Sequence, residues 1–219
     1  MNNNIIIFGS SGHAQVIATI IQRQKKYNIL GFLDDFKPIG TRVLGYTVLG
    51  KIEDIVNFKC SICGGIIGIG DNWARSEIFN KIINLIPHFL FISAIDPSAI
   101  IASNVEIGIG TTIMPGVIVN NNSKIGNFCI LNTKASLDHD GILEDFSSLA
   151  PGVTTGGGVK IGYCTAICLG ANIIHGITIG SQSIVGSGAL VVKNVHSNSV
   201  SYGIPAKHIR NRIIGESYL

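Results

Sequence analysis

Asp138, His139 and Asp140 place a histidine between two carboxylates. An imidazole that shares one ring nitrogen with a carboxylate is oriented and made more basic, so its other nitrogen can take up a proton near pH 7. His139 is therefore a candidate general base. Taken alone, such a histidine can equally be a polar side chain that points into water at a corner of the chain.

Three consecutive glycines, Gly156 to Gly158, occur further along the chain. Glycine leaves its backbone N–H group uncovered, and such a group can stabilise a developing oxyanion. If the chain repeats every eighteen residues, Gly157 lies beside His139 on the neighbouring strand, at about 5 Å. A base next to an uncovered backbone is typical of an acyl-transfer site.

A six-residue repeat between Ile95 and His196 supplies that spacing. Sixteen of its seventeen first positions are Ile, Leu or Val, and the fifth position is nearly always small or β-branched. A period of six fits neither an α-helix nor a single alternating strand. It predicts a parallel β-helix in which three hexads form one coil and the aliphatic position points inward.

The first third of the chain has a different pattern, in which strands alternate with helices. Strands are predicted at 4–8, 29–33 and 66–69, and helices at 14–24 and 75–85. A glycine turn, residues 9–13, follows the first strand, and Asp34 and Asp35 follow the second. This order predicts a Rossmann-like βαβ domain whose turn directs backbone N–H groups at a phosphate.

The nucleotide-binding pattern leaves alternatives open, because Ser11 and Ala14 stand where a dinucleotide fingerprint has glycine. The turn can be purely structural. Asp34 can be a solvated turn residue instead of a ribose or base contact, and His13 can cap the helix instead of touching phosphate. Gly70 ends the third strand, where ligands collect in open sheets.

The composition limits the partners and the compartment. A net charge of +3 over 219 residues is too small to indicate nucleic-acid binding. No apolar run is long enough for a membrane span, and the start lacks the pattern of a signal peptide. Cys60 and Cys63 have no second pair that would complete a zinc site. We therefore expect a cytoplasmic protein with five free thiols and no metal.

Six segments together resemble the family of nucleotide-sugar N-acetyltransferases of the bacillosamine and perosamine type, to which sialic-acid O-acetyltransferases are similar. The segments are 8–13, 32–35, 69–72, 131–133, 138–140 and 203–207. The resemblance covers nearly the whole chain. It implies a left-handed β-helix, a homotrimer, and acetyl-CoA bound between neighbouring prisms without any metal.

The resemblance also implies roles for single residues. His139 would take a proton from the sugar amine, Asp140 would raise the basicity of His139, and the amide of Gly157 would hold the oxyanion. The acetyl-CoA contacts would be Ser148, Leu169 and Ser187, with Ser148 in the place of a histidine typical of the family. The nucleotide-sugar contacts would be Ser11, Gly12, His13, Asp34, Asp35, Gly70 and Asn132.

We therefore expect a Rossmann-like α/β domain at residues 1–90 and a left-handed parallel β-helix at 91–219. The expected activity is acetyl-CoA-dependent N-acetylation of a nucleotide-linked 4-amino-4,6-dideoxy sugar for glycan or lipopolysaccharide synthesis. The nucleotide, whether UDP, dTDP or GDP, stays open. Alternatives are O-acetylation of sialic acid or another polysaccharide sugar, an N-formyl or succinyl donor, and a non-catalytic trimeric sugar-nucleotide-binding protein.

Overall fold

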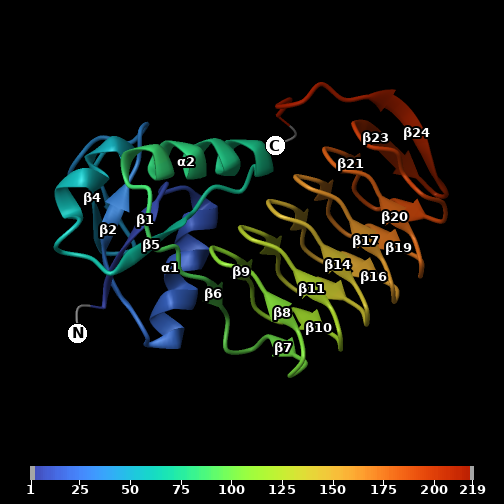
Figure 1. Ribbon diagram of the computed structural model, residues 1–219, viewed down its shortest axis with the longest axis horizontal. Coiled ribbons are helices and arrows are strands. Elements are labelled where there is room, and N and C mark those ends of the chain that lie inside the picture. Colours follow the sequence, from blue (N-terminus) through green and yellow to red (C-terminus); the bar gives the residue numbers. More distant parts are fainter. Residues whose placement is uncertain (1–2, 218–219) are drawn as a thin grey trace.

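The computed structural model describes residues 3–217, which form an α/β domain followed by a triangular prism of stacked strands (Figure 1). The fold class predicted from the sequence is confirmed: the first part is Rossmann-like and the second is a left-handed parallel β-helix. Among the described residues, none of the helices has the length and apolar character needed to span a membrane. All five cysteines are free thiols.

The α/β domain is built on a five-stranded sheet in the order β3-β4-β2-β1-β5. Its strands are β1 Asn4–Phe8, β2 Asn28–Leu33, β3 Arg42–Val43, β4 Tyr46–Gly50 and β5 Gly64–Ile67. The helices are α1 Gly12–Gln24, α2 Asn72–Leu85 and the short 3₁₀-helix η1 Ile52–Phe58. The predicted strands and helices are all present, whereas the β3–β4 pair and η1 were not predicted.

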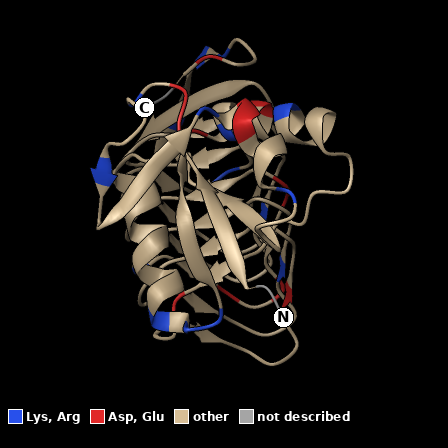
Figure 2. Ribbon diagram, turned by 90° about the vertical axis from the view of Figure 1, so that its left-hand side faces the viewer, with Lys and Arg blue, Asp and Glu red and all other residues tan. Residues whose placement is uncertain are grey.

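The central strand β1 explains why this sheet forms. Its residues Ile5 to Phe8 are fully buried, as expected for a parallel strand that is covered on both faces. β1 pairs in parallel with β2 on one side and with β5 on the other. The strands β1, β2, β4 and β5 contain no charged residue, as Figure 2 shows for the long strands of this domain, whereas the short β3 carries Arg42. The carboxyl ends of β1, β2 and β5 therefore present their loops at one edge.

The prism has three faces, which we call the first, second and third face. The first face contains β7 Ile100–Ile101, β10 Ile118–Val119, β13 Ser136–Leu137, β16 Thr154–Thr155, β19 Asn172–Ile173 and β22 Leu190–Val191. The second face contains β8 Glu106–Ile107, β11 Lys124–Ile125, β14 Ile142–Leu143, β17 Lys160–Ile161 and β20 Thr178–Ile179. The third face contains β6 Ala94–Ile95, β9 Thr112–Ile113, β12 Ile130–Leu131, β15 Ser148–Leu149, β18 Ala166–Ile167, β21 Ile184–Val185, β23 Ser199–Gly203 and β24 Ala206–Asn211.

Strands stack in a register of eighteen residues, as Leu131 beside Leu149 and Leu149 beside Ile167 illustrate. These aliphatic side chains are fully buried and form the interior of the prism. The corners need residues that tolerate a positive φ. Asp140 has φ 59° and Gly158, one coil above, has φ 67°. Glycine adopts this conformation at low cost, which accounts for its frequency at the corners, and Asp tolerates it better than most other residues.

The two parts pack against each other through apolar side chains. α1 lies against β6 on the third face. Phe79 of α2 contacts Phe128 and Phe146, whose rings stack 5.0 Å apart on the corner between the second and third faces. The connection between α2 and β6 includes Phe91, which bridges to Gly65 of the α/β sheet. The domain boundary expected at residue 90 falls within this connection and stays a prediction.

Candidate active site

His139 stands at the corner between the first and second faces, directly after β13. Its Nδ1 atom lies 2.8 Å from Oδ2 of Asp140, and Oδ1 of the same carboxylate accepts a 3.1 Å hydrogen bond from Asn122. The bond to Asp140 raises the pKa of His139, and the same bond lowers the pKa of Asp140. With Nδ1 engaged, Nε2 is the nitrogen left to exchange a proton.

Asp138, the other acidic neighbour, has a different task. Its Oδ1 atom accepts the backbone N–H of His139 at 2.8 Å and the side-chain amide of Asn120 at 2.6 Å. The hydrogen bond from Asn120 is the main cause that lowers the pKa of Asp138. Asp138 therefore shapes the corner, and Asp140 is the acid that orients the imidazole.

Gly157 lies against the imidazole, as the eighteen-residue register predicts. A Cβ atom at this position would collide with Cε1 and Nε2 of His139 and would lie only 2.9 Å from Nδ1. The two backbones are also joined, because the N–H of Gly158 donates to the carbonyl of His139 at 2.8 Å. Only glycine at position 157 leaves room for the imidazole ring of His139.

The N–H of Gly157 has no hydrogen-bond acceptor among residues 3–217. One coil below, the side chain of Asp138 caps the equivalent N–H of His139. The residue before Gly157 is Gly156, which has no side chain that could do the same. The corner that carries His139 and Gly157, which we call the ridge, thus combines a proton acceptor with an uncovered N–H donor. Together these groups can deprotonate a nucleophile and stabilise an oxyanion.

A cavity of about 320 Å³ lies between the α/β domain and the third face of the prism. Six of the predicted binding residues line it: His13, Gly70, Asn132, Ser148, Leu169 and Ser187. The remaining lining is mostly aliphatic and includes Cys168, which sequence reasoning did not single out. Residues predicted for the sugar nucleotide and residues predicted for acetyl-CoA therefore share one cavity.

His13 contributes an unusual group to this cavity. Burial, helped by the positive charge of Arg75, lowers the pKa of His13 to about 4. The imidazole is therefore neutral at pH 7. Its Nε2 atom is buried and has no hydrogen-bond partner among the described residues. Buried polar atoms are rarely left unpaired, so this nitrogen is a candidate contact for a bound molecule.

Asp34 and Asp35 do not line the cavity, and their carboxylates are bonded within the chain. Asp34 accepts hydrogen bonds from the N–H and hydroxyl of Ser10 on one oxygen, and from the N–H groups of Phe36 and Lys37 on the other. Burial acts to raise the pKa of Asp34, but these hydrogen bonds outweigh it and the pKa is lowered.

Asp35 accepts the N–H of Ile52 at 2.9 Å and forms a 3.0 Å ion pair with Lys81. Ser11 and Gly12 stand at the start of α1, where the hydroxyl of Ser11 makes no capping hydrogen bond to the helix. Neither residue lines the cavity. Ligand contacts by these four residues at the glycine turn and after β2 stay predictions.

The two groups of site residues occupy opposite edges of the first face. Asn132 lies in the corner before β13, and His139 lies in the corner after it. The cavity therefore opens near one edge of this face, and the His139–Gly157 ridge forms the other. Within one chain, the base and the cavity are separated by the width of the first face.

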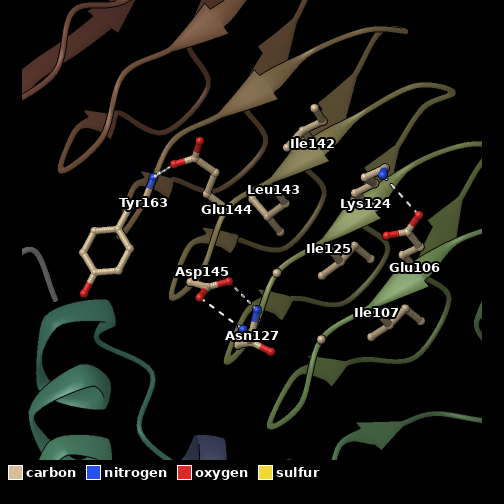
Figure 3. Close-up of a pocket in the computed structure, with 12 residues that line it drawn as sticks. Glu106, Ile107, Lys124, Ile125, Asn127, Ile142, Leu143, Glu144, Asp145 and Tyr163 are labelled. Atoms are coloured by element: carbon tan, nitrogen blue, oxygen red, sulfur yellow. Dashed lines mark hydrogen bonds and ion pairs between the residues drawn. The ribbon is translucent and has the colours of Figure 1, made fainter.

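A second hollow, of about 590 Å³, lies over the second face (Figure 3). Several of its polar side chains are bonded within the chain: Lys124 pairs with Glu106 at 3.1 Å, and Asp145 accepts the backbone N–H and the side-chain amide of Asn127. None of the residues predicted for the site lines it. Within residues 3–217, no group of three or more His, Cys, Asp or Glu side chains could hold a metal ion.

Comparison with known proteins finds likenesses over nearly the whole chain. A family profile described as the PglD N-terminal domain matches residues 4–82. The perosamine N-acetyltransferase from Caulobacter crescentus, solved with CoA and GDP-perosamine, is 31% identical with a TM-score of 0.89. The likeness covers 95% of this chain and 97% of that chain.

The acetyltransferase domain of PglB from Neisseria gonorrhoeae, solved with acetyl coenzyme A, is 28% identical over 95% of this chain and 100% of its own. Its TM-score is 0.89. A curated relative from Schizosaccharomyces pombe, described as an acetyltransferase, is 34% identical over 86 residues. That match spans 39% of this chain and 42% of the relative, so it covers less than half of the relative's length.

Proposed function

The chain belongs to the family of nucleotide-sugar N-acetyltransferases of the bacillosamine and perosamine type, and we propose that it moves the acetyl group of acetyl-CoA onto the amine of a nucleotide-linked amino sugar. The observation that carries this proposal is the imidazole of His139, held by Asp140 and packed on the bare backbone of Gly157. The acceptor we propose is a 4-amino-4,6-dideoxy sugar, because the Caulobacter relative was solved with GDP-perosamine.

The proposed reaction uses three groups of the ridge. Nε2 of His139 takes a proton from the sugar amine as the nitrogen attacks the thioester carbon, and Asp140 stabilises the imidazolium that forms. The N–H of Gly157 donates to the oxyanion of the tetrahedral intermediate. When the C–S bond breaks, the imidazolium returns the proton to the departing thiolate of CoA. The amide bond and free CoA are the products.

We propose that the cavity beside the third face holds the two substrates. His13, Gly70 and Asn132 would contact the nucleotide sugar, and Ser148, Leu169 and Ser187 would contact acetyl-CoA, as their shared lining supports. The wall near Ser148 and Leu169 is largely apolar, which suits the pantetheine arm of the co-substrate. Ser148 is 9% exposed and has a smaller side chain than a histidine, so it leaves more space near the acetyl group.

We further propose that three copies of the chain assemble into the active enzyme. If the first faces of three prisms pack around a threefold axis, the ridge of one copy meets the cavity edge of the next. Ile100 and Ile118 support this arrangement, because they leave 67% and 40% of their surface exposed on that face. We place the enzyme in the cytoplasm, where its proposed substrates are made.

The test is acetyl-CoA turnover against a panel of nucleotide-linked sugars that carry a 4-amino, 3-amino or hydroxyl group. Release of CoA thiol is measured, and the His139→Ala variant serves as the control for background hydrolysis. We expect turnover with an amino sugar. Preferred turnover of the hydroxyl sugars would indicate an O-acetyltransferase instead. Failure to bind acetyl-CoA would indicate a protein that only binds sugar nucleotides.

A further inference from the structure

Arg75 is a fully buried arginine at the joint between the α/β domain and the prism. It stands in the first turn of α2 and is only 1% exposed. Its Nε donates to the carbonyl of Phe128 at 2.8 Å, and one Nη2–H donates to the carbonyl of Phe146 at 2.9 Å. These carbonyls belong to successive coils at the corner between the second and third faces. One guanidinium group is therefore hydrogen-bonded to two successive coils of the prism.

The other end of the same guanidinium holds the loop that follows β5. Nη1 donates to the carbonyls of Ile69 at 3.0 Å and Gly70 at 2.9 Å, and to that of Asp71 at 3.4 Å. Nη2 also donates to the side chain of Asn72 at 2.7 Å. Gly70 lines the cavity together with His13. The side chain thus links the cavity wall of the α/β domain directly to the prism.

The chemistry of the link explains why arginine stands there. Burying a charge is costly unless its donors are satisfied, and here the acceptors come from two separate parts of the fold. The planar fork of arginine reaches both sides at once with fixed geometry. A lysine has a single ammonium group, which cannot span the same carbonyls. The arrangement therefore fixes the distance between the two walls as well as holding them together.

We propose that Arg75 is a positioning residue. Its guanidinium group fixes the backbone of residues 69–71, which lies beside the proposed site of the acceptor sugar, to the prism, which carries the proposed acetyl-CoA contacts. This rests on the proposed function of the cavity. The acceptor amine has to be held within reach of the thioester, and small displacements are costly in such reactions. Arg75 also adds its charge beside His13, whose pKa is lowered mainly by burial.

Arg23 provides a matched control, because it also joins the α/β domain to the prism. Its guanidinium, at the last turn of α1, pairs with the buried carboxylate of Asp96 at 2.7 Å. Neither residue lines the cavity. Arg23→Met therefore weakens the contact between the α/β domain and the prism without changing the cavity wall. Arg75→Met weakens this contact and also frees residues 69–71 of the cavity wall.

The experiment compares Arg75→Met, Arg75→Lys and Arg23→Met in the full chain. Steady-state kinetics with GDP-perosamine, or with the best sugar of the panel, and with acetyl-CoA give the two KM values and kcat. Arg75→Met should raise the KM of the sugar nucleotide and lower kcat, by about tenfold or more in kcat/KM. The KM of acetyl-CoA should stay within about twofold. Arg75→Lys should fold and show a partial loss, and Arg23→Met should keep wild-type kinetics.

A readout that needs no turnover separates this proposal from the proposed function. Amide hydrogen exchange at positions 74 and 75, whose N–H groups donate to Asp71 of the loop, should speed up in Arg75→Met and Arg75→Lys, but not in Arg23→Met. If the wild-type protein acetylates no sugar, the proposed function fails, and the exchange data still test the link. The role of Arg75 is refuted if Arg75→Lys matches Arg23→Met in both exchange and kinetics, or if both KM values rise equally.

Discussion

The imidazole of His139 rests on the backbone of Gly157, where any side chain would collide with the ring. The contact follows from the length of one coil. The two residues are eighteen positions apart, so they occupy equivalent positions on successive coils. It brings the base and the uncovered N–H of Gly157 to one ridge of the prism. This pairing makes several consequences measurable.

Gly157→Ala should lower turnover sharply without changing the oligomeric state. The added methyl group meets Cε1 and Nε2 of His139 and displaces the ring from its place beside Asp140. We expect a loss of about 10²-fold in kcat, because a small misplacement of a catalytic group costs about that much. Steady-state kinetics and size-exclusion chromatography check the two parts of this prediction.

Gly176→Ala is the control for that variant. Gly176 lies one coil above Gly158 on the same ridge, and a Cβ there meets nothing within 4 Å, although φ is 71°. The variant should lose about 1–2 kcal/mol of stability from backbone strain and keep its turnover. Gly157 itself has no positive φ, so backbone strain is not expected in Gly157→Ala. If Gly176→Ala lost as much turnover as Gly157→Ala, a general disturbance of this corner, and not the collision with His139, would explain the loss.

His139→Ala should reduce kcat by at least about 10²-fold, the contribution typical of a general base. The side chain is exposed and contributes no core packing, so the melting temperature should hardly change. Turnover is measured by CoA thiol release, and assembly by sedimentation. Near-normal turnover in this variant would remove His139 from the mechanism.

The β-helix could be predicted because each six-residue repeat meets the same physical requirement. An aliphatic residue such as Leu131 or Leu149 must point inward at every turn, and both are fully buried. The same register predicted that His139 and Gly157 would meet. The βαβ order was predictable in a similar way, since the apolar run at Ile5 to Phe8 has the composition of a strand that is buried on both faces.

Arg75 shows what the sequence could not reveal. Its acceptors are backbone carbonyls, such as those of Phe128 and Phe146, which lie 53 and 71 residues away. Every residue type carries a carbonyl, so no pattern of residue types indicates such a partner. Asp34 is a similar case: its sequence position suggested a ligand contact, but the hydroxyl and N–H of Ser10 occupy one oxygen of its carboxylate.

Asp140→Asn should move the acid limb of the pH–rate profile to lower pH. The hydrogen bond that His139 donates to Asp140 raises the pKa of His139. A general base must be neutral, so kcat/KM falls as the pH drops through that pKa. Without the carboxylate the pKa falls, so the decline begins at a lower pH, and the plateau is also lower because the ring is less basic and less well oriented.

Asp138→Asn is the comparison for the pH profile. Asp138 raises the pKa of His139 only through its charge, a smaller cause than the hydrogen bond from His139 to Asp140. Its variant should shift the acid limb less. The imidazole resonances of His139, followed by NMR titration, report the same order without catalysis. A larger shift for Asp138→Asn than for Asp140→Asn would contradict the assignment of Asp140 as the orienting acid.

Two inactive variants should restore activity when they share a trimer, because the ridge and the cavity lie on opposite edges of the first face. His139→Ala removes the base and leaves the cavity intact, and Leu169→Arg obstructs the cavity and leaves the base intact. In a trimer that contains both variants, about one third of the seams, where the ridge of one copy meets the cavity of the next, join an intact ridge to an intact cavity. Co-expression with two different tags, followed by tandem purification, isolates the mixed trimers.

Each variant alone should be inactive. If base and cavity of the same copy worked together, mixing would restore nothing, and the arrangement of the three copies proposed above would be wrong.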